Sequence, residues 1–327
     1  MSSVVLLRPD KAGDLVKTLP VLRALTQVAP DTKLHLLVSK ANESLLKFEP
    51  KITYSVLPSN WEDLSSPELK ELLDRQLSSY SFQIAINLLC DPFAKIENLL
   101  TLVPAHDKFS INSKTLHTGI WAMTFKEISP IGRDESLNIA ELIGQAMGIN
   151  LLKSTETAER SPHLGDDDIK EAESTLGKKS TPWLAICPFA GTQNRTHPIE
   201  KWQKFIGKVC KRSQFEKIIL FGAPSDSKLL EETKKNIGNP SKLTLAFPSS
   251  FRALGAYLKR CDRVVAVDSG PLHLSLALGI PSLGFLSGGD HLRWFNKVSS
   301  KDKIVYRGIL NRYPSFLEMW WYFSRWT

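Results

Sequence analysis

The chain has 327 residues, an apolar content of 42% and a formal net charge of +8. A domain usually takes about 100–200 residues, so this length predicts two domains. The first residues lack a basic lead, and no apolar run approaches the roughly 18 residues of a membrane-spanning helix, so we expect a cytoplasmic protein. The four cysteines are scattered, which predicts neither a disulfide nor a zinc site.

The charge is distributed unevenly along the chain. The first 160 residues carry 17 Lys and Arg against 19 Asp and Glu, whereas the remaining residues carry 25 against 15. A basic second half is typical of a phosphate-binding domain or of contact with an anionic surface. A solvated basic face without a partner is the alternative.

Strand and helix patterns alternate in the first half. Apolar runs predict buried strands and apolar residues at helical spacing predict helices, in the order strand 3–9, helix 13–30, strand 33–39, strand 82–89 and helix 136–149. Parallel strands joined by helices form doubly wound sheets. The stretch 153–168 is polar and has no apolar period, so it is the candidate linker.

The alternation restarts after this stretch. Predicted strands and helices cover strand 183–191, helix 199–212, strand 217–224, helix 226–238, strand 243–247, helix 251–261, strand 263–270 and strand 281–288. Two such series predict an α/β protein with two Rossmann-like domains whose parallel sheets face a central cleft. We place an N-terminal domain at 1–160, a C-terminal domain at 161–309 and an aromatic helix or tail at 310–327.

Polar residues follow the predicted strand at 263–270, in the stretch VAVDSGPLHLSLALG. Ligands of open parallel sheets bind at the carboxyl ends of strands, where helix N-termini direct N–H groups outward. Ser269, the Gly270 amide and His273 are expected to converge there, and a diphosphate would gain hydrogen bonds and the helix dipole. Alternatively, Asp268 or Ser269 caps the helix and His273 is a satisfied core histidine.

Two further strand ends carry complementary groups. In PFAGTQNRTHPIEKW, Gly191 lets a ligand approach the backbone and Arg195 can offer two parallel hydrogen bonds to a phosphate. In FGAPSDSK, Asp226 stands at a helix start and can accept from a ribose hydroxyl. Surface charge for Arg195 and helix capping for Asp226 are the alternatives. Taken together, the three strand ends predict one binding site.

The first predicted strand ends in RPDKAGDLVKTLP. Gly13 permits a tight bend, and Asp14 at the start of the following helix can act as the general base for a hydroxyl nucleophile. The alternative is that Asp14 is the N-cap of that helix. We expect no metal site, since the Asp-rich stretch GDDDI at 165–169 precedes a helix and acids there are typical of helix capping.

At this point the residues resemble a known family. RPDKAGDLVKTLPVLRAL, PFAGTQNRTHPIEKW, FGAPSD and VDSGPLHLSLALGIPSLGFL are similar, in order and spacing, to the heptosyltransferases of glycosyltransferase family 9. The resemblance implies a GT-B fold, an ADP-heptose donor bound mainly by the C-terminal domain and a lipopolysaccharide inner-core acceptor bound mainly by the N-terminal domain. It also implies metal-independent transfer that inverts the anomeric carbon.

The resemblance assigns roles to single residues. Asp14 falls on the catalytic base, Asp226 on an acid that contacts the nucleoside ribose, and the donor motif falls on Asp268, Ser269, Gly270 and His273. Arg195 stands where the family often has Lys, which keeps the charge and changes its shape. Ala190 and Gly191 stand where hydroxyl residues can assist phosphate binding, so either Thr192 substitutes for them or that contact is absent.

The implied partners are ADP-heptose or a related nucleotide sugar and a lipid-linked saccharide acceptor, with no cofactor and no nucleic acid. Two other functions stay open, a non-catalytic nucleotide-sugar-binding GT-B protein and a nucleotide-sugar epimerase-type enzyme.

The C-terminal end, residues 306–327, is rich in aromatic and basic residues. It is either an interfacial segment that contacts the cytoplasmic face of the inner membrane or a helix packed across the two domains with its aromatics buried.

Overall fold

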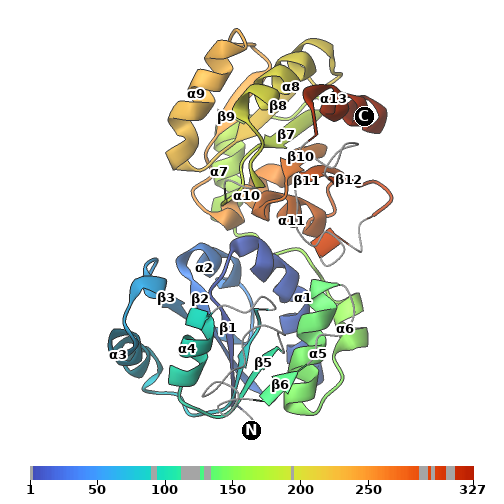
Figure 1. Cartoon of the computed structure of the whole chain (residues 1–327). Helices are drawn as coiled ribbons and strands as arrows, with labels where there is room; N and C mark the ends of the chain where they lie inside the picture. Colours follow the sequence, from blue (N-terminus) through green and yellow to red (C-terminus); the bar gives the residue numbers. More distant parts are fainter. Residues whose placement is uncertain are drawn as a thin grey trace. The chain divides into compact units, whose positions relative to one another are not determined.

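The computed structural model describes residues 3–89, 94–111, 126–128, 134–192, 195–286, 294–295, 299–306 and 314–327. The chain divides into two compact units, Met1–Arg160 and Ser161–Thr327. Each unit is a parallel sheet with helices packed against it (Figure 1). The predicted linker is not extended throughout, because it also contains helix α6 (Leu152–Thr157) and the first turn of helix α7 (Asp166–Leu176).

The first unit has a six-stranded sheet in the order β3-β2-β1-β4-β5-β6, and every neighbouring pair is parallel. Its elements are β1 (Ser3–Arg8), α1 (Ala12–Val28), β2 (Lys33–Ser39), α2 (Lys40–Leu46), β3 (Ile52–Leu57), the short 3-10 helix Trp61–Asp63, α3 (Ser66–Leu77), β4 (Phe82–Asn87), α4 (Ala94–Leu102), β5 (Ala105–Ile111), β6 (Lys126–Ile128), α5 (Glu135–Met147) and α6. Helix α5 ends at Gly148, whose φ of 69° lies in the left-handed region that glycine adopts readily.

The second unit repeats this arrangement with the order β12-β11-β10-β7-β8-β9, again with parallel pairs throughout. Its elements are α7, β7 (Trp183–Cys187), α8 (Ile199–Arg212), β8 (Lys217–Phe221), the 3-10 helix Pro224–Asp226, α9 (Ser227–Asn236), β9 (Leu243–Ala246), α10 (Phe251–Lys259), β10 (Arg263–Val267), α11 (Gly270–Ala277), β11 (Ser282–Leu286), β12 (Lys303–Tyr306) and α13 (Phe316–Trp326).

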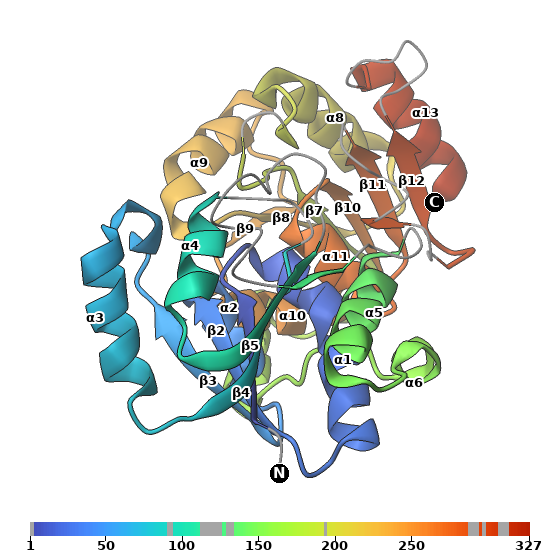
Figure 2. The same ribbon diagram turned by 60° about the horizontal axis from the view of Figure 1, so that its bottom comes forward.

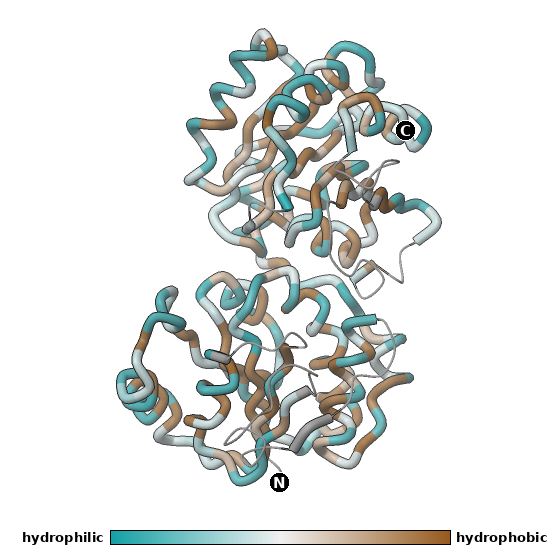
Figure 3. The backbone as a smooth tube through the Cα atoms, in the orientation of Figure 1, coloured by the Kyte–Doolittle hydropathy of each residue, from teal (hydrophilic) through white to brown (hydrophobic). Residues whose placement is uncertain are grey.

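Hydrophobic residues are frequent in the strands (Figure 3), and the buried cores join side chains of the strands with side chains of the helices. In the second unit, Trp202, Phe205 and Ile206 of α8 are fully buried against Leu184 and Ile186 of β7. Such burial of large apolar side chains is the main stabilising contribution to a sheet-and-helix layer.

Helix α13 belongs to the second unit, where it packs against α8 and β11 (Figure 2). Its Met319 and Phe323 are fully buried in that core, while Trp321 on the opposite face is 46% exposed. Packing therefore accounts for one face of the aromatic C-terminal segment and leaves another face in solvent. Within the residues described above, none of the helices combines the length and apolar character that a bilayer crossing requires.

The strand order determines where ligands bind. In both sheets the chain moves outward from a central pair of strands, β1 and β4 in the first unit and β7 and β10 in the second. After one strand of such a pair the chain continues to the next strand on one side, and after the other strand it continues on the opposite side. This change of direction opens a crevice at the carboxyl ends of the two strands. Each unit thus has one preferred binding position, beyond β1 and β4 or beyond β7 and β10.

Candidate active site

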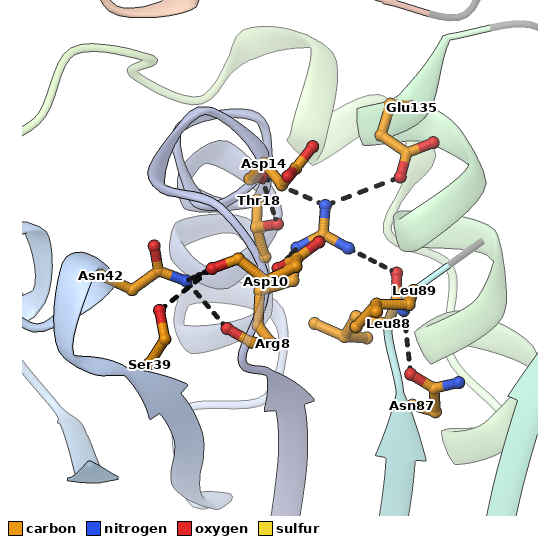
Figure 4. A network of polar contacts seen from close by, with 10 residues as sticks. All are labelled: Arg8, Asp10, Asp14, Thr18, Ser39, Asn42, Asn87, Leu88, Leu89 and Glu135. Atoms are coloured by element: carbon orange, nitrogen blue, oxygen red, sulfur yellow. Dashed lines mark hydrogen bonds and ion pairs between the residues drawn. The ribbon is translucent and has the colours of Figure 1, made fainter. Parts of the chain in front are cut away.

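A buried arginine lies at the carboxyl ends of the two central strands of the first unit (Figure 4). Arg8, the last residue of β1, is 1% exposed, and its Nη1 donates to the carbonyl oxygen of Leu88, just beyond β4, at 2.7 Å. Its Nη2 donates to the carbonyl oxygen of Asp14 at 3.3 Å. The guanidinium therefore links the two central strands to the first turn of α1.

Two carboxylates complete the surroundings of this guanidinium. Asp10 Oδ1 lies 3.4 Å from Arg8 Nε, and Glu135 Oε1 lies 3.6 Å from Arg8 Nη2. Burial raises the pKa of Asp10 to about 8, with further increases from the Asp14 and Glu135 carboxylates and an opposing effect of Arg8. Asp10 therefore releases its proton at a higher pH than an exposed aspartate does.

Side chains from α2 and the end of β2 hold the turn that carries Asp10. Asn42 Nδ2 donates to the carbonyl oxygens of Arg8 and Asp10, at 2.9 and 3.1 Å, and Ser39 Oγ donates to that of Asp10 at 3.0 Å (Figure 4). Buried backbone carbonyls outside a sheet need such partners. The backbone between β1 and α1 is thus fixed from both sides, by Arg8 and by Asn42.

Asp14 is not the N-cap of α1. The N-cap is Lys11, and Asp14 is the third residue of the helix, with a half-buried side chain. Its carbonyl oxygen accepts from Thr18 Oγ1 at 2.9 Å as well as from Arg8. The backbone of Asp14 is therefore immobilised by side chains.

Sequence reasoning missed Arg8, although a charged residue at the end of an apolar strand was a detectable signal.

The proton on Asp10 predicts a pH dependence of stability. The folded chain retains this proton up to about pH 8, whereas the unfolded chain releases it near pH 3.8. The folded state binds more protons between these values, so this group lowers the free energy of unfolding as the pH rises. Asp10→Asn removes that contribution, so we expect its urea midpoint to fall less than that of the wild type between about pH 5 and about pH 8.

A matched control for this experiment is Asp31→Asn, which alters an exposed carboxylate in the loop after α1. Its midpoints should run parallel to those of the wild type. Equal pH dependence in all three proteins would contradict a shifted pKa at Asp10.

Three predicted residues meet at the crevice of the second unit. Arg195, beyond β7, places Nε 3.7 Å from Oδ2 of Asp268, beyond β10, and His273 Nε2 lies 3.9 Å from Asp268 Oδ1. Asp268 and His273 are each 6% exposed, whereas Arg195 is 41% exposed. The His273 ring stacks on Phe295 with 4.9 Å between centroids. A buried carboxylate thus orients an accessible guanidinium beside the start of α11.

The start of α11 is not capped by the Ser269 side chain. Ser269 Oγ donates instead to the carbonyl oxygen of Val267 at 3.1 Å, and no side-chain cap bond is formed at this helix. Gly270 is the first helical residue, followed by Pro271, which has no N–H. Near Arg195, the Thr192 hydroxyl is buried and has no hydrogen-bond partner among the described residues. The Thr192 hydroxyl and the N–H of Gly270, the first helical residue, are therefore the donors that an anion could use here.

A cavity of about 560 Å³ opens beside this cluster, along the carboxyl ends of β7, β8 and β9. Its walls are mostly apolar and come from four connections, with the residues Cys187, Phe189, Ala190, Gly191, Phe221, Gly222, Ala223, Pro224, Ser225, Asp226, Pro248, Ser249, Ser250, Phe251, Leu254 and Pro271. Predicted residues Gly191 and Asp226 line it. Ser249 and Ser250 were missed, although they follow a predicted strand, and the strand-end argument applied to them equally.

Asp226 shapes the turn beyond β8. Its Oδ2 accepts the N–H of Ala223 at 2.8 Å, which realises the capping alternative for one carboxylate oxygen. Gly222 lies in the same turn, and a Cβ atom there would come within 2.7 Å of Leu230 and 3.0 Å of Asp226. A side chain at 222 would therefore displace the carboxylate. The glycine keeps Asp226 at the cavity wall.

The Asp-rich stretch 165–169 serves a structural purpose. Asp168 Oδ2 accepts the N–H of Gly165 at 2.8 Å, which caps α7 as predicted. The same carboxylate pairs with buried Arg252 of α10, with Nε at 2.5 Å and Nη2 at 3.2 Å. In the ranges that the structure covers, no group of three His, Cys, Asp or Glu side chains is arranged to hold a metal ion.

Comparison with known proteins identifies the family. The model of glycosyltransferase family 9 (heptosyltransferase) matches residues 73–318, well over half of the chain. The chain belongs to glycosyltransferase family 9. The predicted resemblance is therefore confirmed, and the chain is a transferase rather than a binding module or an epimerase.

Relatives of this family 9 glycosyltransferase include lipopolysaccharide heptosyltransferase 3 of Escherichia coli K12, 24% identical over 286 residues that cover 86% of this chain and 81% of the relative. The lipopolysaccharide core heptosyltransferase OpsX of Haemophilus influenzae is 24% identical over 300 residues, 89% of this chain and 80% of the relative.

Solved structures confirm the predicted GT-B fold. A family 9 glycosyl transferase from Veillonella parvula matches with a TM-score of 0.75 and 15% identity, over 98% of this chain and 91% of that one. E. coli heptosyltransferase WaaC with ADP matches with a TM-score of 0.71 and 17% identity, over 99% of this chain and 100% of that one. At these identities the likeness concerns the fold.

Proposed function

We propose that this glycosyltransferase transfers a heptose from ADP-heptose to an acceptor hydroxyl of the lipopolysaccharide inner core, with inversion at the anomeric carbon and without a metal ion. The observation that carries the proposal is an apolar cavity with the accessible guanidinium of Arg195 and the start of α11 beside it. A nucleoside diphosphate matches both features, because its nucleoside suits the cavity and its diphosphate suits the cationic and N–H groups. WaaC, which shares this fold, has been solved with ADP and with ADP-2-deoxy-2-fluoro heptose.

The cavity is proposed to hold the nucleoside. Phe221, Pro248 and Leu254 offer apolar surface to a base, and Asp226 offers a carboxylate to a ribose hydroxyl. The diphosphate would then extend past Gly191 and Pro271 toward Thr192, Arg195 and the N-terminus of α11. This path would join the two groups of predicted residues into one donor site.

The proposed transfer step combines this donor site with Asp14 of the first unit. The Asp14 carboxylate takes the proton of the acceptor hydroxyl while that oxygen forms a bond to the anomeric carbon. The bond from this carbon to the diphosphate oxygen breaks on the opposite face, and ADP leaves with the electron pair. The step requires Asp14 and the donor to meet in one complex with the acceptor, after which Asp14 returns its proton to solvent.

The charge that develops on ADP is proposed to be stabilised by the protein. Arg195 supplies a planar cation, and the start of α11 supplies the N–H of Gly270 and the positive end of the helix dipole. Asp268 and His273 are proposed to hold this arrangement through the contacts at 3.7 and 3.9 Å. These groups would stabilise the charge that a divalent cation stabilises in metal-dependent transferases. We therefore expect a chelator such as EDTA to leave the rate unchanged.

A two-stage experiment tests the proposal. Thermal shifts with ADP, UDP, GDP and CMP should show stabilisation by ADP above the others, and turnover of ADP-heptose should then require an inner-core acceptor. Inverted stereochemistry in the product can be checked by NMR. Stabilisation by a different nucleotide, or consumption of the donor without any acceptor, would contradict the assignment.

A further inference from the structure

A basic hollow lies in the second unit at the amino ends of the strands, whereas the donor cavity lies at their carboxyl ends. The hollow measures about 580 Å³ and contains four cationic side chains, Arg263, Lys301, Lys303 and Arg325, and the single carboxylate of Asp302. Arg263 and Lys303 begin β10 and β12, so the hollow is at the amino ends of these strands. The donor cavity is at the carboxyl ends of β7, β8 and β9.

The carboxylate in the basic hollow is committed to the backbone. Asp302 Oδ1 accepts the N–H of Ser282 at 2.9 Å, and its Oδ2 accepts the N–H of Ser299 at 2.9 Å. It therefore stabilises the connection before β12, and its single negative charge is outnumbered by the four cationic side chains. Lys301 and Arg325 have exposed side chains. The hollow consequently has an excess of accessible positive charge.

Exposed apolar side chains stand next to the basic hollow on α13. Leu317 is 69% exposed, the largest fraction among the exposed large apolar side chains of the described residues, and Trp321 is 46% exposed. They are four residues apart and share one face of the helix. Arg325, one turn further, lies over the Trp321 ring at 4.2 Å, and Lys303 lies 5.9 Å from its centroid. Apolar and cationic groups are thus interleaved on one surface.

This combination fits the boundary region of an anionic bilayer. Lipid phosphates would enter the basic hollow, while Leu317 and the amphipathic Trp321 ring would insert among the headgroups and upper acyl chains. The opposite face of α13 is held by Met319 and Phe323, so the exposed face is presented on a fixed support. The second unit is basic as a whole, which adds long-range attraction to the negative charge of the lipid headgroups.

We propose that the exposed face of α13 and the basic hollow form a docking surface for an anionic lipid membrane. The surface binds shallowly, through headgroup phosphates and two inserted side chains. It goes beyond the proposed transfer reaction and does not depend on the donor or on Asp14. Docking here leaves the donor cavity, at the carboxyl ends of the strands of the second unit, free for soluble nucleotide sugar.

Vesicle sedimentation with the full chain tests this proposal. The wild type should bind vesicles of phosphatidylcholine with phosphatidylglycerol and should not bind vesicles of phosphatidylcholine alone, and added salt should weaken the binding. Each cation near an anionic membrane strengthens binding roughly fivefold. The variant Lys301→Gln/Arg325→Gln should therefore bind roughly 25-fold more weakly.

The matched control is Lys234→Gln/Lys235→Gln on α9, which removes the same charge from another surface of the second unit. It should retain most of the affinity of the wild type. Leu317→Ser/Trp321→Ser should also lose binding, whereas Leu229→Ser, at a 40% exposed position of α9, should not.

Three outcomes would overturn the proposal. They are equal binding to neutral and anionic vesicles, an equal loss in the α9 control, and self-association that Leu317→Ser/Trp321→Ser abolishes, which would make the surface an interface between copies. ADP binding measured on the same variants separates this proposal from the proposed function. If the wild type bound vesicles but did not bind ADP, the proposed function would be contradicted and the docking surface would not.

Discussion

Asp14→Asn is expected to lower kcat by about 10²–10⁴-fold, the usual contribution of a general base, with ADP affinity unchanged. Asparagine has the same shape as aspartate and cannot accept the proton. The two hydrogen bonds that Arg8 and Thr18 make to residue 14 involve its backbone carbonyl and survive the substitution. The fall should therefore report lost proton transfer rather than a displaced helix. Steady-state rates with saturating donor and acceptor, together with calorimetry of ADP, measure both quantities.

Asp31→Asn serves again as the control in the same unit, with an expected rate equal to that of the wild type. If Asp14→Asn transferred the sugar at the wild-type rate, the base would have to be another residue. A joint loss of ADP affinity and rate would instead indicate a structural effect.

Arg195→Ala is expected to weaken ADP binding by about 10–100-fold, because a hydrogen bond to a charged group contributes roughly 1.5–3 kcal/mol. The turnover number should fall by a further 10²–10³-fold or so, since the guanidinium meets charge that grows as ADP leaves. Arg195 is 41% exposed, so loss of its ion pair with Asp268 should change stability by about 1 kcal/mol or less. Calorimetry, initial rates and a urea midpoint check the three quantities.

Arg195→Lys distinguishes charge from geometry at this position. Lysine keeps the charge and loses the planar fork, so intermediate values are expected for both ADP affinity and rate. Arg212→Ala, at the exposed end of α8, is the control and should have wild-type values. Unchanged ADP affinity and turnover in Arg195→Ala would remove this residue from the donor site.

Elements with a clear apolar period were predicted closely. Helix α8 occupies the predicted residues 199–212, because Trp202, Phe205 and Val209 recur on one buried face. Strand β3, at the sheet edge, was missed, since its half-buried residues ITYSVL alternate only weakly. Strand β7 ends at Cys187, four residues before the predicted end, because the chain turns there to form the cavity wall.

The site was predicted in part. Polar groups after strands indicated Arg195, Asp268 and His273, and these three do lie together. Arg8 was missed because its importance comes from Leu88, a contact 80 residues away in the sequence. The raised pKa of Asp10 was equally inaccessible, since it depends on burial and on charges from three other positions.

By itself, the sequence determined that two strand-and-helix series follow one another and that polar residues stand at the ends of several strands. These are local properties, because apolar periodicity and turn-forming residues act over a few positions. Only the tertiary structure decided that β1 adjoins β4 and that β7 adjoins β10. Strand neighbours are selected by pairing between distant segments, and this pairing brings Arg8 to Leu88 and Arg195 to Asp268.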